Sequence, residues 1–333
     1  MDGKTIAVLG AGGHTGRFVV AELERRGVTV RPFTRSSHFT PFGREETPCA
    51  VLDFSQPDEL ARNLAGADAV INCAGPFLDT AEPAVEAAIR ASIPYLDLAA
   101  EQVTAQRLFE RYDERARAAG ITIQPAMAFF GGLADLLASS LVQPAETVER
   151  IDIAVGLDSW HPTSGTRLTG RKNTYERLIV RDHQLVTVPA PPPATDWDFP
   201  APLGAQPVTC VPLSEIILIA RHLKPAAMTS YMNLKPLADL KAADSPAPEA
   251  VDSRGRSAQS FVMDVRATVS GETRRATASG QDIYAVSAPL IVAACLRLLE
   301  ANQPPTGVRA PGELFDARPF LTALSPDIDV RYW

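Results

Sequence analysis

Glycines cluster directly after the first apolar run of the chain. Thr5–Leu9 has the composition of a short buried strand, residues 10–16 read GAGGHTG, and Thr15–Arg26 shows helical spacing of apolar side chains. Glycines between a strand and a helix allow a tight turn, close approach of the backbone to a pyrophosphate, and close helix–strand packing. A glycine-rich turn without a ligand is the alternative. We predict a dinucleotide-binding loop made of Gly10, Gly12, Gly13, His14, Thr15 and Gly16.

The end of the second predicted strand, Val28–Phe33, indicates which dinucleotide is bound. An NAD-preferring site usually carries a carboxylate about 20 residues after the glycines, but residues 27–44 contain no Asp or Glu. They offer a guanidinium between two hydroxyl groups, which suits a 2′-phosphate. We therefore predict that Thr34, Arg35 and Ser36 bind NADP(H) in preference to NAD(H). The alternative is that Arg35 is a surface cation.

Residues after the later strands are the next candidates, because ligands of open parallel sheets bind beyond the carboxyl ends of the strands. Small residues after the fourth strand let the backbone pass beside a nicotinamide ribose, and an aromatic ring there can wall the nicotinamide. The predicted cofactor contacts are Asp53, Cys73, Ala74, Gly75, Pro76 and Phe77. Near the same crevice we expect Glu101 as a catalytic candidate, and Phe129 and Phe130 as substrate contacts.

A second group of candidates follows Ser164, which can cap a helix. Arg167 and Arg171 are spaced to share one helix face and could clamp a substrate carboxylate or phosphate. Lys172 and Tyr175 are added as catalytic candidates. A solvated charged face is the alternative interpretation.

The order of predicted elements indicates two domains. Strands and helices alternate regularly up to Ile121–Pro125, which predicts a parallel sheet covered on both faces. Longer alternating strands follow, at Arg150–Leu157, Leu178–Val188 and a hairpin that turns at Ser270–Glu272. The proline-rich stretch Pro189–Pro207 is predicted to be an extended loop.

Composition excludes several classes of protein. The chain has 333 residues, 46% of them hydrophobic, and a net charge of −7, so a non-specific nucleic-acid binder is not expected. The four cysteines are scattered and read as reduced thiols of a cytoplasmic protein, without a disulfide frame or a metal site. No signal peptide or membrane span is expected, because the uncharged stretches are short or broken by proline and glycine.

Three motifs together resemble the saccharopine dehydrogenase-like reductases: GAGGHTG at 10–16, NCAGPF at 72–77 and YLDLAAE at 95–101. The resemblance implies a Rossmann domain, an inserted α+β substrate domain whose sheet often dimerises, and a C-terminal helix that packs back on the Rossmann domain. Family members often show DLxGE, where this chain has Ala100 before Glu101, so the pocket there is expected to differ.

We therefore expect an α/β fold with a Rossmann domain over residues 1–130, an inserted substrate domain over 131–280, and a tail over 281–333 that returns to the Rossmann domain. The expected function is an NADPH-dependent oxidoreductase, acting as a homodimer on a C=N or activated C=C bond of a small organic substrate bound between the domains. The alternative is a non-catalytic NADP-binding sensor or scaffold.

Overall fold

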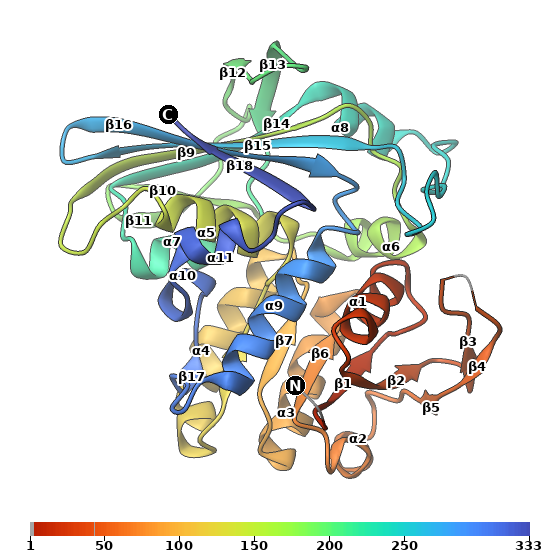
Figure 1. The fold of residues 1–333 in the computed structure, drawn as a ribbon. Coiled ribbons are helices and arrows are strands. Elements are labelled where there is room, and N and C mark those ends of the chain that lie inside the picture. The colour runs from red at the N-terminus through yellow and green to blue at the C-terminus, as the bar shows by residue number, and fades with distance from the viewer. Residues whose placement is uncertain (1–2, 43) are drawn as a thin grey trace.

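The computed structural model describes residues 3–42 and 44–333, and it contains two large sheets (Figure 1). The first is a seven-stranded sheet with the order β17-β8-β7-β6-β1-β2-β5, in which every pair is parallel. The predicted doubly wound parallel sheet is confirmed. Its strands are β1 (Thr5–Leu9), β2 (Thr29–Thr34), β5 (Ala50–Val51), β6 (Ala69–Asn72), β7 (Tyr95–Asp97), β8 (Thr122–Gln124) and β17 (Gly307–Val308).

Helices cover both faces of this sheet, and β1 shows why the strands are apolar throughout. Ile6 and Val8 pack into a core with α1 (His14–Arg25) and α9 (Ser287–Glu300). Ala7 and Leu9 point to the opposite face and pack with α2 (Pro57–Leu64), α3 (Phe77–Ala91) and α4 (Gln102–Ala118). Since alternate side chains enter two different cores, the four residues after Thr5 are all buried.

The order of strands reverses at β1. The chain moves from β1 to β2 and β5 on one side, and from β6 to β7 and β8 on the other. The connections that leave the carboxyl ends of β1 and β6 therefore diverge, which is the position where open α/β sheets bind ligands.

The second sheet has nine strands, in the order β11-β10-β14-β9-β15-β16-β18, with the β12–β13 hairpin joined through β13 to β14. The predicted hairpin that turns at Ser270–Glu272 is confirmed as β15 and β16. The strands of the second sheet are β9 (Val148–Leu157), β10 (Leu178–Arg181), β11 (Gln184–Thr187), β12 (Ala194–Asp198), β13 (Ala205–Cys210), β14 (Ala227–Asn233), β15 (Ser260–Val269), β16 (Glu272–Gln281) and β18 (Ile328–Tyr332). The remaining elements are β3 (His38–Phe39), β4 (Thr47–Pro48), a π-helical turn (Phe129–Leu133), α5 (Ala134–Ser139), α6 (Ser164–Lys172), α7 (Glu215–His222), α8 (Leu234–Lys241), α10 (Pro311–Leu314) and α11 (Ala317–Thr322).

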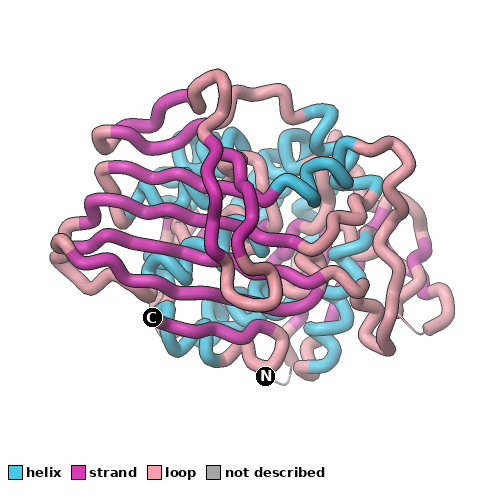
Figure 2. Tube along the Cα trace, turned by 90° about the horizontal axis from the view of Figure 1, so that it is seen from above, coloured by secondary structure: helices cyan, strands magenta, loops and turns pink. Residues whose placement is uncertain are grey.

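The proline-rich stretch 189–207 is not the extended loop that the sequence predicts. It contains β12 and the start of β13, and this hairpin runs across the outer face of the second sheet (Figure 2). Trp197 and Phe199 from the hairpin pack on Tyr231 and Val262 of the sheet. The prolines are tolerated because six of the seven lie outside β12 and β13, and Pro207 of β13 is paired with β12 but not with β14. The predicted strand 178–188 is likewise two strands, β10 and β11, with the turn residues Asp182 and His183 at positive φ.

The tail after residue 280 serves both domains, which corrects the prediction that all of it returns to the Rossmann domain. Helix α9 packs on α1, and β17 extends the first sheet beside β8. The last strand, β18, instead pairs with β16 of the second sheet. Between them, Gly312 N–H donates to Asp135 Oδ2 at 2.9 Å, and His222 Nε2 lies 2.6 Å from Asp135 Oδ1. These contacts fasten the tail to α5 and α7.

The contact between His222 and Asp135 predicts that the stability of the fold depends on pH. Burial alone would lower the pKa of His222, but the adjacent Asp135 carboxylate outweighs it and raises the pKa above 6.5. The protonated histidine therefore stabilises the fold fully below pH 6.5, and this contribution is lost as the pH rises through the raised pKa. We expect the free energy of unfolding, measured with urea, to fall over that range. The His222→Gln variant should lack this step, and an identical pH profile for the variant would contradict the assignment.

Candidate cofactor and active site

The glycine loop between β1 and α1 has two buried or left-handed glycines that packing requires, Gly10 and Gly16, and two that are exposed to solvent, Gly12 and Gly13. Gly10 has φ +78°, and a Cβ on it would lie 2.8 Å from the backbone of Ala74 after β6. A Cβ on Gly16 would lie 2.1 Å from the Gly10 carbonyl oxygen. Gly12 and Gly13 are exposed, and no side chain caps α1. The N–H groups of the first helical turn are therefore available to an anion such as a pyrophosphate.

The segment at the end of β2 carries the buried Thr34 and the exposed Arg35. Thr34 is buried, and its hydroxyl is occupied by Ser36, whose carbonyl oxygen it contacts at 2.5 Å. Its predicted direct contact with the cofactor is therefore replaced by a role in shaping the loop. Arg35 is exposed and makes no hydrogen bond or ion pair with the described part of the chain. Asp53, after β5, is also exposed, and hydrogen bonds from Ser55 lower its pKa.

Two side-chain hydrogen bonds to the backbone of Ala74 stabilise the turn after β6. Asn72 Oδ1 accepts from Ala74 N–H at 3.0 Å, and Thr80 Oγ1 donates to the Ala74 carbonyl oxygen at 2.6 Å. Gly75 is left exposed, with the Phe77 ring beside it. Cys73 is half-buried, and burial, with a smaller contribution from Asp97, raises the pKa of its thiol. The turn therefore presents backbone at Gly75, and its thiol is held neutral.

Glu101 supports this turn and is not positioned as an open catalytic group. Its side chain is 1% exposed. Oε1 accepts from Phe77 N–H at 3.2 Å, and Oε2 accepts from Ala100 N–H at 3.0 Å. Burial raises the pKa of the carboxyl group, although these N–H donors oppose the shift. We therefore assign Glu101 as a positioning residue that fixes Phe77.

The four candidates on and after α6 do not converge on one site. Arg167 donates to the carbonyl oxygens of Ala242 and Ser245, whereas Arg171 is exposed and has no partner in the described residues. Lys172 forms an ion pair with Asp79 of α3, and Tyr175 OH accepts from Arg107 of α4. Lys172, at the end of α6, and Tyr175, just after it, therefore connect the second domain to helices α3 and α4 of the Rossmann domain.

The sequence profile of one protein family, described as saccharopine dehydrogenase NADP binding domain, matches residues 6–123. This range includes the glycine loop, the turn after β6 and Glu101. The N-terminal domain is therefore similar to this family over residues 6–123. The resemblance that its three motifs predict is confirmed.

Comparisons with whole proteins extend the same relationship. A probable mitochondrial saccharopine dehydrogenase-like oxidoreductase from Arabidopsis thaliana is 27% identical over 197 residues, which cover 53% of this chain and 42% of that protein. The saccharopine dehydrogenase-like oxidoreductase of Bos taurus is 26% identical over 155 residues, covering 39% and 35%. The match thus spans less than half the length of these relatives. Apo saccharopine dehydrogenase (L-Glu forming) from Saccharomyces cerevisiae shares the fold, with a TM-score of 0.68 over 99% of this chain and 100% of that chain at 12% identity.

A polar cluster beside the glycine loop is not predicted by the sequence. Tyr284 OH accepts from Trp160 Nε1–H at 2.9 Å and lies 2.8 Å from Thr166 Oγ1. The His14 ring of the glycine loop packs edge-on against Tyr284, with 5.2 Å between ring centroids, and burial lowers its pKa. His14 thus contributes its backbone to the loop, and its side chain joins this cluster. The residues lie far apart in sequence, so no spacing could reveal them.

The two phenylalanines predicted as substrate contacts separate. Phe129 is 2% exposed and packs on Phe261, with ring centroids 4.8 Å apart. It is a core residue, which corrects the prediction. Phe130 is half-buried and lies beside the polar cluster, with its ring centroid 6.0 Å from that of Trp160. Tyr231 and Lys235 have the spacing of a Tyr-x-x-x-Lys motif, but they lie on β14 and α8 and so do not share a helix.

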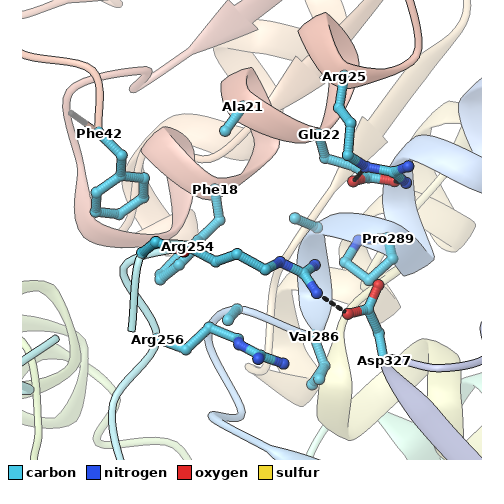
Figure 3. Close-up of a pocket in the computed structure, with 13 residues that line it drawn as sticks. Phe18, Ala21, Glu22, Arg25, Phe42, Arg254, Arg256, Val286, Pro289 and Asp327 are labelled. Atoms are coloured by element: carbon cyan, nitrogen blue, oxygen red, sulfur yellow. Dashed lines mark hydrogen bonds and ion pairs between the residues drawn. The ribbon is translucent and has the colours of Figure 1, made fainter. Parts of the chain in front are cut away.

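A cavity of about 240 Å³ lies away from the glycine loop, between α1, α9 and the loop 253–256 (Figure 3). Its arginines already have carboxylate partners. Arg254 donates to Asp327 at 2.5 Å, and Arg25 bonds Glu22 at 2.7 Å (Figure 3). Because these cations are neutralised within the protein, we do not assign the cavity to the cofactor.

No helix in residues 3–42 and 44–333 has the length and apolar character of a membrane span.

Proposed function

We propose that this protein is an NADPH-dependent oxidoreductase that reduces a C=N or an activated C=C bond of a small organic substrate. The observation that carries the proposal is the exposed pair Gly12 and Gly13, which lies where the strand order reverses and next to the exposed turn at Gly75. The curated relatives are named oxidoreductases, which supports the same activity.

The side chains around this crevice have separate tasks in the proposal. The bound nicotinamide supplies the hydride, whereas the protein binds and orients the reactants. Glu101 fixes the Phe77 wall beside the nicotinamide. Helix α6 reaches both sides of the crevice, because Thr166 contacts Tyr284 and Thr169 Oγ1 lies 3.7 Å from where a Cβ on Gly75 would be. These hydroxyl groups can orient a polar substrate and exclude bulk water.

The hydroxyl groups also favour an enzyme over a non-catalytic sensor, whose nicotinamide face should be apolar or blocked. Screening a panel of imines and enoyl compounds for oxidation of NADPH tests the activity. Turnover of one class would identify the reduced bond. NADPH binding without turnover of any imine, enoyl or carbonyl compound would favour the sensor instead.

The cofactor preference predicts a specific effect at Arg35. A charge-assisted contact with the 2′-phosphate is worth roughly 1.5–3 kcal/mol, or about one to two decades of affinity. Arg35→Ala should raise the dissociation constant for NADPH by about that factor and leave NADH nearly unchanged, as measured by titrating cofactor fluorescence. If the wild type prefers NADH, or if both cofactors weaken equally, Arg35 is only a surface charge.

We also propose a cytoplasmic homodimer formed through the second sheet. The β12–β13 hairpin covers part of the outer face of the second sheet. The proposal rests on the family resemblance and on the exposed end of the edge strand β18, where Trp333 is 67% exposed. Light scattering at micromolar concentration should return about twice the chain mass of 35.7 kDa. A monomer mass would contradict the proposal.

A further inference from the structure

Arg17 is a cation of the glycine loop that no step of the proposed function uses. It follows Gly16 in the first turn of α1 and is half-buried. Its Nε–H is buried and has no acceptor among the described residues. Arg25, about two turns further along the same helix, is instead bonded to Glu22. Burying an N–H of a cation without an acceptor costs free energy. Arg17 shares this feature with Arg221 and Arg266, and it differs from them in its position beside the glycine loop.

The guanidinium of Arg17 lies against the segment that carries Arg35. It stacks over the Phe42 ring, 5.1 Å from the centroid. At the other end of the segment, a Cβ on Gly12 would lie 3.3 Å from both Thr34 Cγ2 and Phe39 Cβ. Residues 34–42 therefore contact the glycine loop at one end and the first turn of α1 at the other. Arg17 and Arg35 border the same short stretch of backbone.

The ring of Phe42 is itself fixed from both domains. Phe18 of α1 packs against it, with ring centroids 4.6 Å apart, and both line one side of the cavity in Figure 3. Gly255 of the inserted domain has φ +81°, and a Cβ there would lie 2.7 Å from the Phe42 ring. The stacked guanidinium of Arg17 is thus held in place before any ligand arrives. A fixed, planar guanidinium suits recognition of phosphate oxygens.

We propose that Arg17 is a second cation for the 2′-phosphate of NADP(H), acting together with Arg35. This inference rests on the proposed function, and it assigns the specificity of that site to a residue on α1 as well as one after β2. A phosphate with up to two negative charges can accept from two guanidinium groups at once. The lack of carboxylates in residues 27–44 leaves both cations available to it.

The test compares the affinities of the full-length protein for NADPH and NADH. Arg17→Gln should raise the dissociation constant for NADPH by about tenfold, with NADH changing by less than about twofold. Arg17→Lys retains the charge and should recover part of the loss. Arg25→Gln is the matched control on the same helix, and it should change neither affinity. Circular dichroism of each variant establishes that α1 is intact.

The outcomes separate this inference from the proposed function. If the wild type binds NADPH in preference to NADH but Arg17→Gln binds it equally well, only the Arg17 assignment is wrong. Equal weakening of NADPH and NADH would also overturn it, because the residue would then act through the loop and not through the 2′-phosphate. If the wild type binds neither dinucleotide, the proposed function itself fails.

Discussion

Replacing Gly16 with valine should destabilise the protein by roughly 3 kcal/mol, which is at the upper end of the usual cost of overpacking. A Cβ at this position would lie 2.1 Å from the Gly10 carbonyl oxygen and 2.9 Å from its carbonyl carbon. Both are backbone atoms, so no side-chain rotation relieves the overlap. Helix α1 would have to move away from β1, and the glycine loop between them would lose its shape.

The measurement is the midpoint and slope of urea unfolding for the wild type and the variant. Gly170→Ala is the matched control, because nothing lies within 4 Å of a Cβ there and the residue is inside α6. The control should be neutral or more stable by up to about 1 kcal/mol, since alanine favours helix. Equal midpoints for Gly16→Val and the wild type would mean that the loop does not pack as described.

The first domain could be predicted from sequence because its signals are local. The glycines lie within one turn, the strands are short apolar runs, and each helix follows its strand directly. The second domain could be predicted only in part, because its strands pair with partners that are distant in sequence. Strand β18 pairs with β16, and β12–β13 covers the outer face, and neither choice is visible in the local pattern.

The site shows the same division. The glycine loop and Arg35 could be predicted from the sequence, because the glycines directly follow strand β1 and Arg35 directly follows strand β2. The roles of Lys172 and Tyr175 could not be predicted, because they depend on contacts that α6 and the residues after it make with Asp79 of α3 and Arg107 of α4. The Tyr284 cluster joins four segments, and its hydrogen bonds arise only when the two domains meet. The type of a residue can suggest that it is functional, but its hydrogen-bond partners depend on how the elements pack.

Glu101 distinguishes a positioning role from a catalytic one, because the two roles predict different effects of substitution. Glu101→Ala removes the acceptors of two N–H groups, those of Phe77 and Ala100. An unsatisfied buried donor costs about 1–3 kcal/mol, so we expect a loss of roughly 3 kcal/mol in the free energy of unfolding. Urea unfolding measures this loss, and titration with NADPH should show weaker binding because the Phe77 wall is no longer fixed.

Glu101→Gln completes the comparison. An amide keeps one acceptor oxygen, so it should preserve part of the stability and most of the affinity for NADPH. Since burial raises the pKa of Glu101, the neutral amide also resembles the protonated form of the group. If Glu101 only positions Phe77, the glutamine variant should keep a large share of any turnover. A glutamine variant that unfolds like the wild type but has lost turnover would overturn this assignment, because such a result requires Glu101 to donate or accept a proton in the reaction.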